Sequence, residues 1–272
     1  PQVMIRNNKQ NVTDLQGQSL FQKPTVESRT YSYSPAEERF YNMLTEFIVT
    51  GKAYASSLGG RDGRAVMLVL ISMQKLASSS VAAILRALRG RLDRIGATSE
   101  SLRELREASD LLSRQQEAEA GGDLDDVSRL DEDLAEAALQ LIDNEREWLQ
   151  RLIEAGEDVH VETKIETILA TVTAMEHDTS VLFFTEYKAT QSLLMSSLIA
   201  HFGAEAVTFI NGDGEARGVT GRDGRQHTIR TRREDAAKRF NSGATRFLVS
   251  TEAAGEGIDL QGSCHTLIHV DL

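Results

Sequence analysis

The chain is poor in the residues that mark disulfide-stabilised or membrane-spanning proteins. Its 272 residues include one cysteine, Cys264, and three prolines, and aromatic residues make up only 6%. A single cysteine excludes an internal disulfide framework and is typical of a reducing compartment. No apolar run approaches the ~20 residues that a membrane-spanning helix needs. We therefore expect a cytoplasmic protein without membrane contact, long enough for one large or two modest domains.

Other recognisable signals are also missing. The N-terminal residues 1–6 lack a basic region followed by a long apolar segment, so no secretory signal is expected. Pro1 stands where a complete chain carries methionine, which is typical of a fragment. The sequence contains no Gly-x-x-x-x-Gly-Lys-Ser/Thr loop, so nothing in it is expected to cradle nucleotide phosphates in that way. Cys264, His265 and His269 do not match a zinc spacing, and we predict no metal site.

The negative charge is concentrated in one segment. Residues 96–158 hold 19 of the 41 acids but 6 of the 30 lysines and arginines, a net charge of 6 − 19 = −13. The remainder carries 24 − 22 = +2, which together gives the chain's −11. A nucleic-acid partner for the remainder is therefore compatible with the acidic composition.

That acidic segment has a coiled-coil-like pattern. Apolar residues recur at three- and four-residue steps between Val127 and Trp148, and Gly121-Gly122 breaks the preceding arm. This spacing predicts an antiparallel helical hairpin over residues 99–155. It could dock a partner or tune an activity, but its charge pattern favours a solvated insertion.

The segment before the acidic insertion reads as helical. Ser34, Pro35 and Glu37 form a capping box with proline at the first helical position, so a helix is expected to begin at Pro35. The glycine-rich stretch 56–64 is expected to form a loop, followed by helical structure over residues 65–94.

From Val159 onward, short apolar strands alternate with amphipathic helices. Strands are expected at 181–184, 206–210, 247–250 and 266–270. The alternation predicts βαβ units and a mainly parallel sheet. Parallel sheets bind ligands at the carboxyl ends of their strands, so candidate site loops follow Phe184, Ile210, Ser250 and Val270.

Residues 247–261 carry the most specific pattern. They read FLVSTEAAGEGIDLQ, an apolar strand that ends in a hydroxyl pair, then a turn in which two glycines flank Glu256. This stretch resembles motif V of superfamily 2 helicases, in the form used by Swi/Snf-type DNA translocases. Residues 181–191, VLFFTEYKATQ, are similar to motif IV of the second RecA-like lobe. The nearest groups are the RNA-polymerase-associated ATPase RapA and helicases of phage-defence systems.

The resemblance implies an order of domains. Residues 1–95 are expected to hold the end of a first lobe and a helical linker region. Residues 96–158 form the acidic helical hairpin insertion, which lies outside the resemblance. Residues 159–272 are expected to form a second RecA-like lobe, truncated before the family's final arginine motif. The expected fold class is α/β, a truncated RecA-like parallel-sheet lobe preceded by a largely helical region with the inserted hairpin.

The same resemblance supplies candidate site residues. In the family the motif V turn lies at the cleft between lobes, which assigns nucleotide binding to Gly255, Glu256, Gly257 and Asp259. Nucleic-acid binding is expected at Thr185, Lys188, Gly212, Arg232, Arg233 and Thr251. Residues 217–239 carry eight bases and three acids, a composition suited to phosphate backbone contacts. Turn formation, helix capping and a solvated basic face are the alternatives for these residues.

We therefore interpret the chain as a fragment of an ATP-dependent Swi/Snf-type DNA translocase. The resemblance implies that the parent protein uses ATP and Mg²⁺, while the fragment lacks the motifs needed to hydrolyse ATP alone. Duplex DNA is the favoured partner, and an RNA-directed helicase is one alternative. The other alternative is a non-catalytic module that docks a protein partner through residues 99–155.

Overall fold

A computed structural model of the protein describes residues 25–96, 141–142, 144–251, 258–262 and 264–271. The chain divides into two compact units, residues 1–31 and residues 32–272. The described part of the first unit, residues 25–31, has no helix or strand. Most of the acidic hairpin expected over residues 99–155 lies outside the described residues, as does the motif V turn at residues 252–257.

The second unit begins with a helix whose start was predicted. Helix α1 spans Pro35–Leu58, and Ser34 caps it. The backbone N–H of Glu37 donates to Ser34 Oγ at 3.3 Å, and the Ser34 N–H donates to Glu37 Oε2 at 2.8 Å. The capping box is therefore confirmed, because each residue satisfies a backbone donor that the helix leaves without a partner.

The loop predicted over residues 56–64 is wrong. Helix α2 spans Gly60–Ser79 and begins directly after Gly59, so the connection is a single tight turn. Gly59 and Gly60 adopt φ values of +64° and +57°, which glycine tolerates better than other residues. A Cβ at Gly63 would lie 2.4 Å from the Ala55 carbonyl oxygen. The glycines thus allow two helices to approach closely, rather than loosening a loop.

The helical region predicted over residues 65–94 is divided at Ser80. Helix α3 spans Val81–Gly96. Ser80 has an extended backbone, and its Oγ accepts a hydrogen bond from the Ala83 N–H at 3.0 Å. Ser80 therefore starts α3, because a serine side chain can accept from a backbone donor in the first turn.

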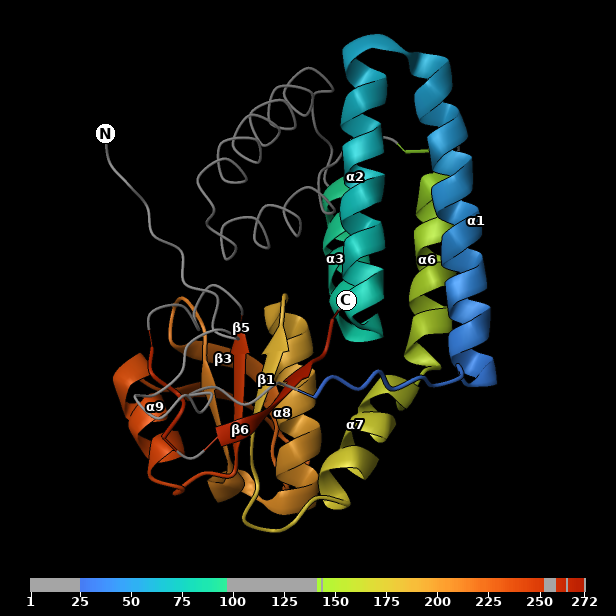
Figure 1. Ribbon diagram of the computed structural model, residues 1–272. Coiled ribbons are helices and arrows are strands. Elements are labelled where there is room, and N and C mark those ends of the chain that lie inside the picture. The colour runs from blue at the N-terminus through green and yellow to red at the C-terminus, as the bar shows by residue number, and fades with distance from the viewer. Residues whose placement is uncertain (1–24, 97–140, 143, 252–257, 263, 272) are drawn as a thin grey trace, which may run out of the picture. The chain divides into compact units, whose positions relative to one another are not determined.

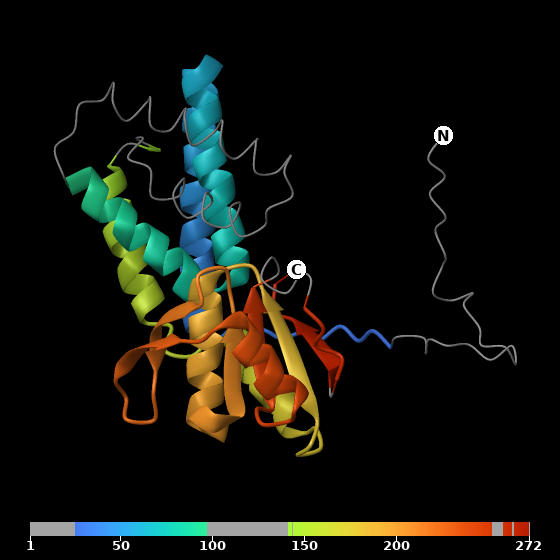
Figure 2. The ribbon, with the colours of Figure 1, turned by 90° about the vertical axis from the view of Figure 1, so that its left-hand side faces the viewer.

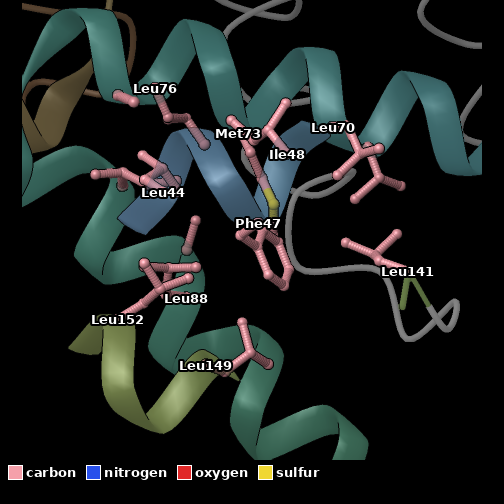
Figure 3. Close-up of a cluster of buried hydrophobic side chains, with 14 of the residues drawn as sticks. Leu44, Phe47, Ile48, Leu70, Met73, Leu76, Leu88, Leu141, Leu149 and Leu152 are labelled. Carbon is pink, nitrogen blue, oxygen red and sulfur yellow. The ribbon is translucent and has the colours of Figure 1, made fainter. Parts of the chain in front are cut away.

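Helices α1, α2 and α3 form a core together with α6, which spans Glu145–Glu157. Figure 3 shows its side chains, among them Phe47, Met73 and Leu149. Beside this core, the fully buried Arg91 of α3 pairs with Glu145, whose Oε2 also accepts from the Leu141 N–H at 2.8 Å. The ion pair fixes α6, which lies within the acidic segment, to α3.

The following region has the predicted α/β organisation. Helix α7 (Thr163–Thr173) precedes β1 (Ser180–Thr185), α8 (Lys188–Phe202), the short 3₁₀ helix η2 (Ala204–Ala206) and β2 (Val207–Ile210). Helix α9 (Arg233–Asn241), β5 (Phe247–Thr251) and β6 (Cys264–His269) complete it. The four strands form a parallel sheet in the order β2-β5-β1-β6, of which β1, β5 and β6 are labelled in Figure 1. The predicted class, a parallel α/β lobe preceded by a helical region, is confirmed.

The sheet is covered on both faces, as parallel sheets require. Phe183, Phe247 and Val249 belong to a buried cluster with residues of α7 and α8. Leu182 and Leu248, whose side chains alternate with these along the strands, cluster instead with Phe240 and other residues of α9 and the loop near Leu260. Continuous apolar strands of this kind are the sequence signal of a sheet buried on both faces.

One element was not predicted. Strands β3 (Glu215–Thr220) and β4 (Gln226–Arg230) form an antiparallel ribbon that lies beside α8, shown in orange in Figure 2. Ala216 and Val219 are buried against the α8 side of the sheet. The turn contains Asp223-Gly224, with Gly224 at φ +73°. An Asp-Gly pair between alternating residues is a strong hairpin signal, so this ribbon was predictable.

A polar joint connects the helical region to the α/β lobe. Lys164 of α7 donates its Nζ to the carbonyl oxygens of Ser78 and Ser79, at 2.9 Å and 2.7 Å. Glu37 Oε1 accepts from the Thr163 N–H at 3.0 Å, and Glu162 Oε1 accepts from the Ala82 N–H at 3.1 Å. The N-termini of α1, α3 and α7 thus meet at two buried carboxylates, each placed where a helix favours negative charge.

Candidate nucleic-acid interface

The loops predicted to carry the site follow the carboxyl ends of adjacent strands. Thr185 at the end of β1 pairs in register with Thr251 at the end of β5. Ile210 at the end of β2 pairs with Ser250. Thr251 therefore lies at the end of an internal strand, between the loops that carry Lys188 and Gly212. The structure brings these candidates to one edge of the sheet, as expected for a parallel sheet.

Thr251 has an unusual environment. The residue is 1% exposed, and its Oγ1 has no hydrogen-bond partner among the residues that the structure describes. A buried hydroxyl normally has a partner, because burying it without one costs about 1–3 kcal/mol. Its position at the end of β5 suits a hydroxyl that donates to a ligand oxygen.

Lys188 spans the end of β5. It begins α8, which follows β1, and its Nζ donates to Asp213 Oδ2 at 3.0 Å in the loop after β2. Burial alone would raise the pKa of Asp213, but hydrogen bonds from Lys188 and from the Glu215 N–H together hold it below its ordinary value. The ion pair joins the segments that follow β1 and β2, the two neighbours of β5, and leaves the Lys188 side chain 31% exposed.

The basic residues at the start of α9 reach the same edge. The N–H of Thr231 donates to the Gly214 carbonyl at 3.0 Å, which ties the end of the ribbon to the loop after β2. Gly214 has φ +68°, and a Cβ there would lie 2.7 Å from the Thr231 oxygen. Arg232 then caps α9, and Arg233 is its first residue. A helix N-terminus favours an anionic group because its first N–H groups point outward.

The structure divides the basic stretch predicted over residues 217–239. Arg222 donates its Nε to the Ile199 carbonyl at 3.3 Å, near the C-terminal end of α8. That end lies away from the site, because α8 begins at the site edge. Arg217 and Arg230 both pair with Glu215. Arg232 and Arg233 lie where the ribbon joins α9, next to the loop after β2, and are the members of this stretch that we keep as candidates for the edge.

Thr185 has a partner within the protein. Its Oγ1 donates to Asp271 Oδ2 at 2.7 Å, and the Glu186 N–H donates to the same oxygen at 2.6 Å. Asp271 follows β6, the strand that neighbours β1, and sequence reasoning gave it no role. Because the Thr185 hydrogen is used in this bond, Thr185 organises the loop after β1.

The nucleotide-binding candidates are only partly described. Gly255, Glu256 and Gly257 lie outside the described residues. Asp259 is exposed, its Oδ1 accepts from the Gln261 N–H at 3.0 Å, and its carbonyl accepts from Asn241 Nδ2 at 2.7 Å. Asp259 is therefore the one nucleotide-binding candidate whose surroundings the structure describes.

The region around Cys264 shows no sign of a metal centre. Among the described residues no group of three or more His, Cys, Asp and Glu side chains could hold a metal ion. Burial raises the pKa of the Cys264 thiol, although hydrogen bonds with the backbone of Thr266 and Leu182 oppose the shift.

Within the described ranges, no helix has the length and hydropathy needed to span a membrane.

Comparisons with known proteins give a family match for one part of the chain. Residues 163–272 match the family model of the helicase conserved C-terminal domain. The matched residues are those of the α/β lobe, from the start of α7 onward. No curated protein matches the chain.

Among solved structures, the helicase domain of Hef from Pyrococcus furiosus is similar at 11% sequence identity, with a TM-score of 0.43. The match covers 87% of this chain and 46% of that chain, so the present chain spans under half of its length.

Proposed function

We propose that this chain is part of an ATP-dependent nucleic-acid translocase of the Swi/Snf type, and that the carboxyl edge of its sheet forms part of the nucleic-acid track. Duplex DNA is the proposed substrate. The observation that carries the proposal is the buried hydroxyl of Thr251, which has no partner among the described residues and lies at the sheet edge where Lys188 pairs with Asp213, in a region that matches the helicase family model.

Each proposed contact suits a phosphate. The Thr251 hydroxyl can donate to a phosphate oxygen, and the exposed Gly212 lets a backbone N–H approach one closely. Lys188, Arg232 and Arg233 would supply positive charge. Such contacts hold the backbone without reading the base sequence, as a translocating motor requires. Because Lys188 already pairs with Asp213, phosphate binding would have to share this lysine or displace the carboxylate.

ATP and Mg²⁺ belong to the proposed whole protein. ATP would supply the free energy for closing two lobes on the nucleic acid. The described residues do not test how this chain holds a nucleotide, since Asp259 is the one described candidate. The part that we assign to this chain is therefore the binding and orientation of the nucleic-acid backbone.

Binding of equal-length duplex DNA, single-stranded DNA and RNA to the whole chain, followed by fluorescence anisotropy from 50 to about 200 mM salt, tests the proposal. We expect duplex DNA to bind most tightly, with an affinity that falls as salt rises. The variant Arg232→Gln should bind more weakly and with a shallower salt dependence, by about one released counterion. The matched control Arg86→Gln, at an exposed position of α3, should bind as the wild type does.

The outcomes separate the functions that the sequence left open. Tighter binding of RNA than of duplex DNA would favour an RNA-directed helicase. Absence of binding to all three nucleic acids would overturn the proposal and favour a protein-docking module. Equal losses in Arg232→Gln and Arg86→Gln would show that binding follows overall charge and not the sheet edge.

A further inference from the structure

One buried amide joins the ends of two neighbouring strands at the candidate site. Gln191 lies in the first turn of α8 and is fully buried. Its Nε2 donates to the carbonyl oxygen of Ile210 at 3.0 Å and to that of Val249 at 2.9 Å. Ile210 is the last residue of β2, and Val249 lies two residues before the end of β5. Both amide hydrogens therefore hold strand ends.

The oxygen of the same amide extends the network. Gln191 Oε1 accepts from Asn211 Nδ2 at 2.8 Å, and this Nδ2 also donates to the Glu215 carbonyl at 3.0 Å, where β3 begins. Asn211 is 4% exposed, and its Oδ1 has no partner among the described residues. The bonds thus run from α8 through the ends of β2 and β5 to the turn that contains Gly212.

The chemistry of this position requires an amide. It needs two donors for two carbonyl oxygens and one acceptor for an N–H group, and a glutamine side chain supplies all three. A leucine of similar size would leave those buried partners unsatisfied. A charged carboxylate would accept from Asn211 but would face the two carbonyl oxygens without a hydrogen to donate.

We infer that Gln191 is a positioning residue, which fixes the offset between the Asn211-Gly212 turn and the Ser250-Thr251 strand end so that both meet one phosphate backbone. The role in binding rests on the proposed function. The fixed offset between the two strand ends rests on the hydrogen bonds alone, so it can be tested without nucleic acid.

The test compares Gln191→Leu with Thr190→Val in the whole chain. Thr190 is the preceding residue and is also fully buried, but its hydroxyl bonds with Ser79 and Ser80 in the polar joint, at 2.6 Å and 2.7 Å. Amide hydrogen exchange over residues 210–215 and 249–251 measures the alignment of the strand ends. Anisotropy with a fluorescent duplex across a salt series measures the binding.

We expect Gln191→Leu to accelerate exchange at both strand ends and to weaken binding about tenfold at every salt concentration. The slope of affinity against salt should not change, because a hydroxyl and a backbone N–H release no counterions. Thr190→Val should lower thermal stability without either effect. In Gln191→Glu, binding should recover in part as pH falls, because a protonated carboxyl group regains one donor; Gln191→Leu should show no such recovery.

The two hypotheses fail separately. Unchanged exchange at the strand ends in folded Gln191→Leu would overturn the positioning role, as would equal binding losses in Gln191→Leu and Thr190→Val. A wild-type chain that binds no nucleic acid would overturn the proposed function, and the exchange measurement alone would then decide whether Gln191 aligns the strand ends.

Discussion

Replacement of Asp271 by alanine should destabilise both the helical region and the α/β lobe. Asp271 accepts hydrogen bonds from Thr185 Oγ1, the Glu186 N–H and Ser79 Oγ, at 2.7, 2.6 and 2.9 Å, and Lys164 Nζ lies 3.9 Å away. The side chain is 12% exposed. Ser79 belongs to the helical region and the other partners to the lobe, so this one carboxylate serves both.

The magnitude follows from what the substitution leaves behind. A hydrogen bond to a charged group contributes about 1.5–3 kcal/mol, and three such bonds would sum to roughly 4.5–9 kcal/mol. That sum is too large, because Ser79 keeps Thr190 as a second partner and water can enter a site that is not fully buried. Breaking a buried charged pair costs about 3–5 kcal/mol. We expect Asp271→Ala to lower the free energy of unfolding by about 3 kcal/mol, and Asp271→Asn, which retains one acceptor oxygen, by about 2 kcal/mol.

Urea unfolding with two probes tests this value. The single tryptophan, Trp148, lies in α6 and reports on the helical region, while far-ultraviolet circular dichroism reports on both regions. The two transitions should coincide in the wild type and separate in Asp271→Ala. The control Asp93→Ala, at an exposed position of α3, should change stability by less than about 0.5 kcal/mol. Equal stabilities of Asp271→Ala and Asp93→Ala would refute the reasoning.

Three further predictions concern buried titratable groups. The pKa of Glu162 is raised, above all because the side chain is buried. The stability that protonated Glu162 contributes to the folded protein is therefore present at low pH and lost as pH rises through that pKa. Glu162→Gln should be more stable than the wild type at pH 7, and chemical denaturation across pH should show no such fall for it. Arg91→Leu, which leaves Glu145 buried without its cation, should cost about 3–5 kcal/mol in urea unfolding, and Arg91→Leu with Glu145→Leu should cost less. Because burial raises the pKa of Cys264, its alkylation by iodoacetamide should be slower than that of free cysteine at pH 8, and unfolding in urea should abolish the difference.

Features that depend on local sequence were predictable. The capping box at Ser34 involves residues three apart, and the apolar strands around Phe183 and Phe247 are complete within five or six residues. The parallel sheet followed from their alternation with helices. The stretch at Gly59 was misread, because glycines break helices to form loops and also permit two helices to pack closely, and the sequence alone does not distinguish these uses.

The polar contacts between distant segments could not be predicted. Ser79 and Asp271 are 192 residues apart in sequence, and no periodic pattern relates them. Gln191 reads as an ordinary helical residue until the sheet brings two carbonyl oxygens to its amide. Thr185 is predicted to bind nucleic acid as a strand-end hydroxyl, and nothing in the sequence indicated that Asp271, which follows β6, would accept a hydrogen bond from it. The order of the strands, which places β6 beside β1, brings Asp271 to Thr185.

Three consecutive residues connect the regions that these contacts define. Glu186 donates its N–H to Asp271 in the polar joint, Tyr187 is 1% exposed and packs in the core of the helical region, and Lys188 reaches Asp213 at the sheet edge. Since they are consecutive and lead into α8, which begins at Lys188, their backbone cannot shift at one contact without moving the others. Tyr187 supplies apolar burial, which has little directional preference, while the hydrogen bonds of the joint require one geometry. A force that reoriented the helical region would therefore move Lys188, and the sheet edge that we propose to bind nucleic acid would respond through this short segment.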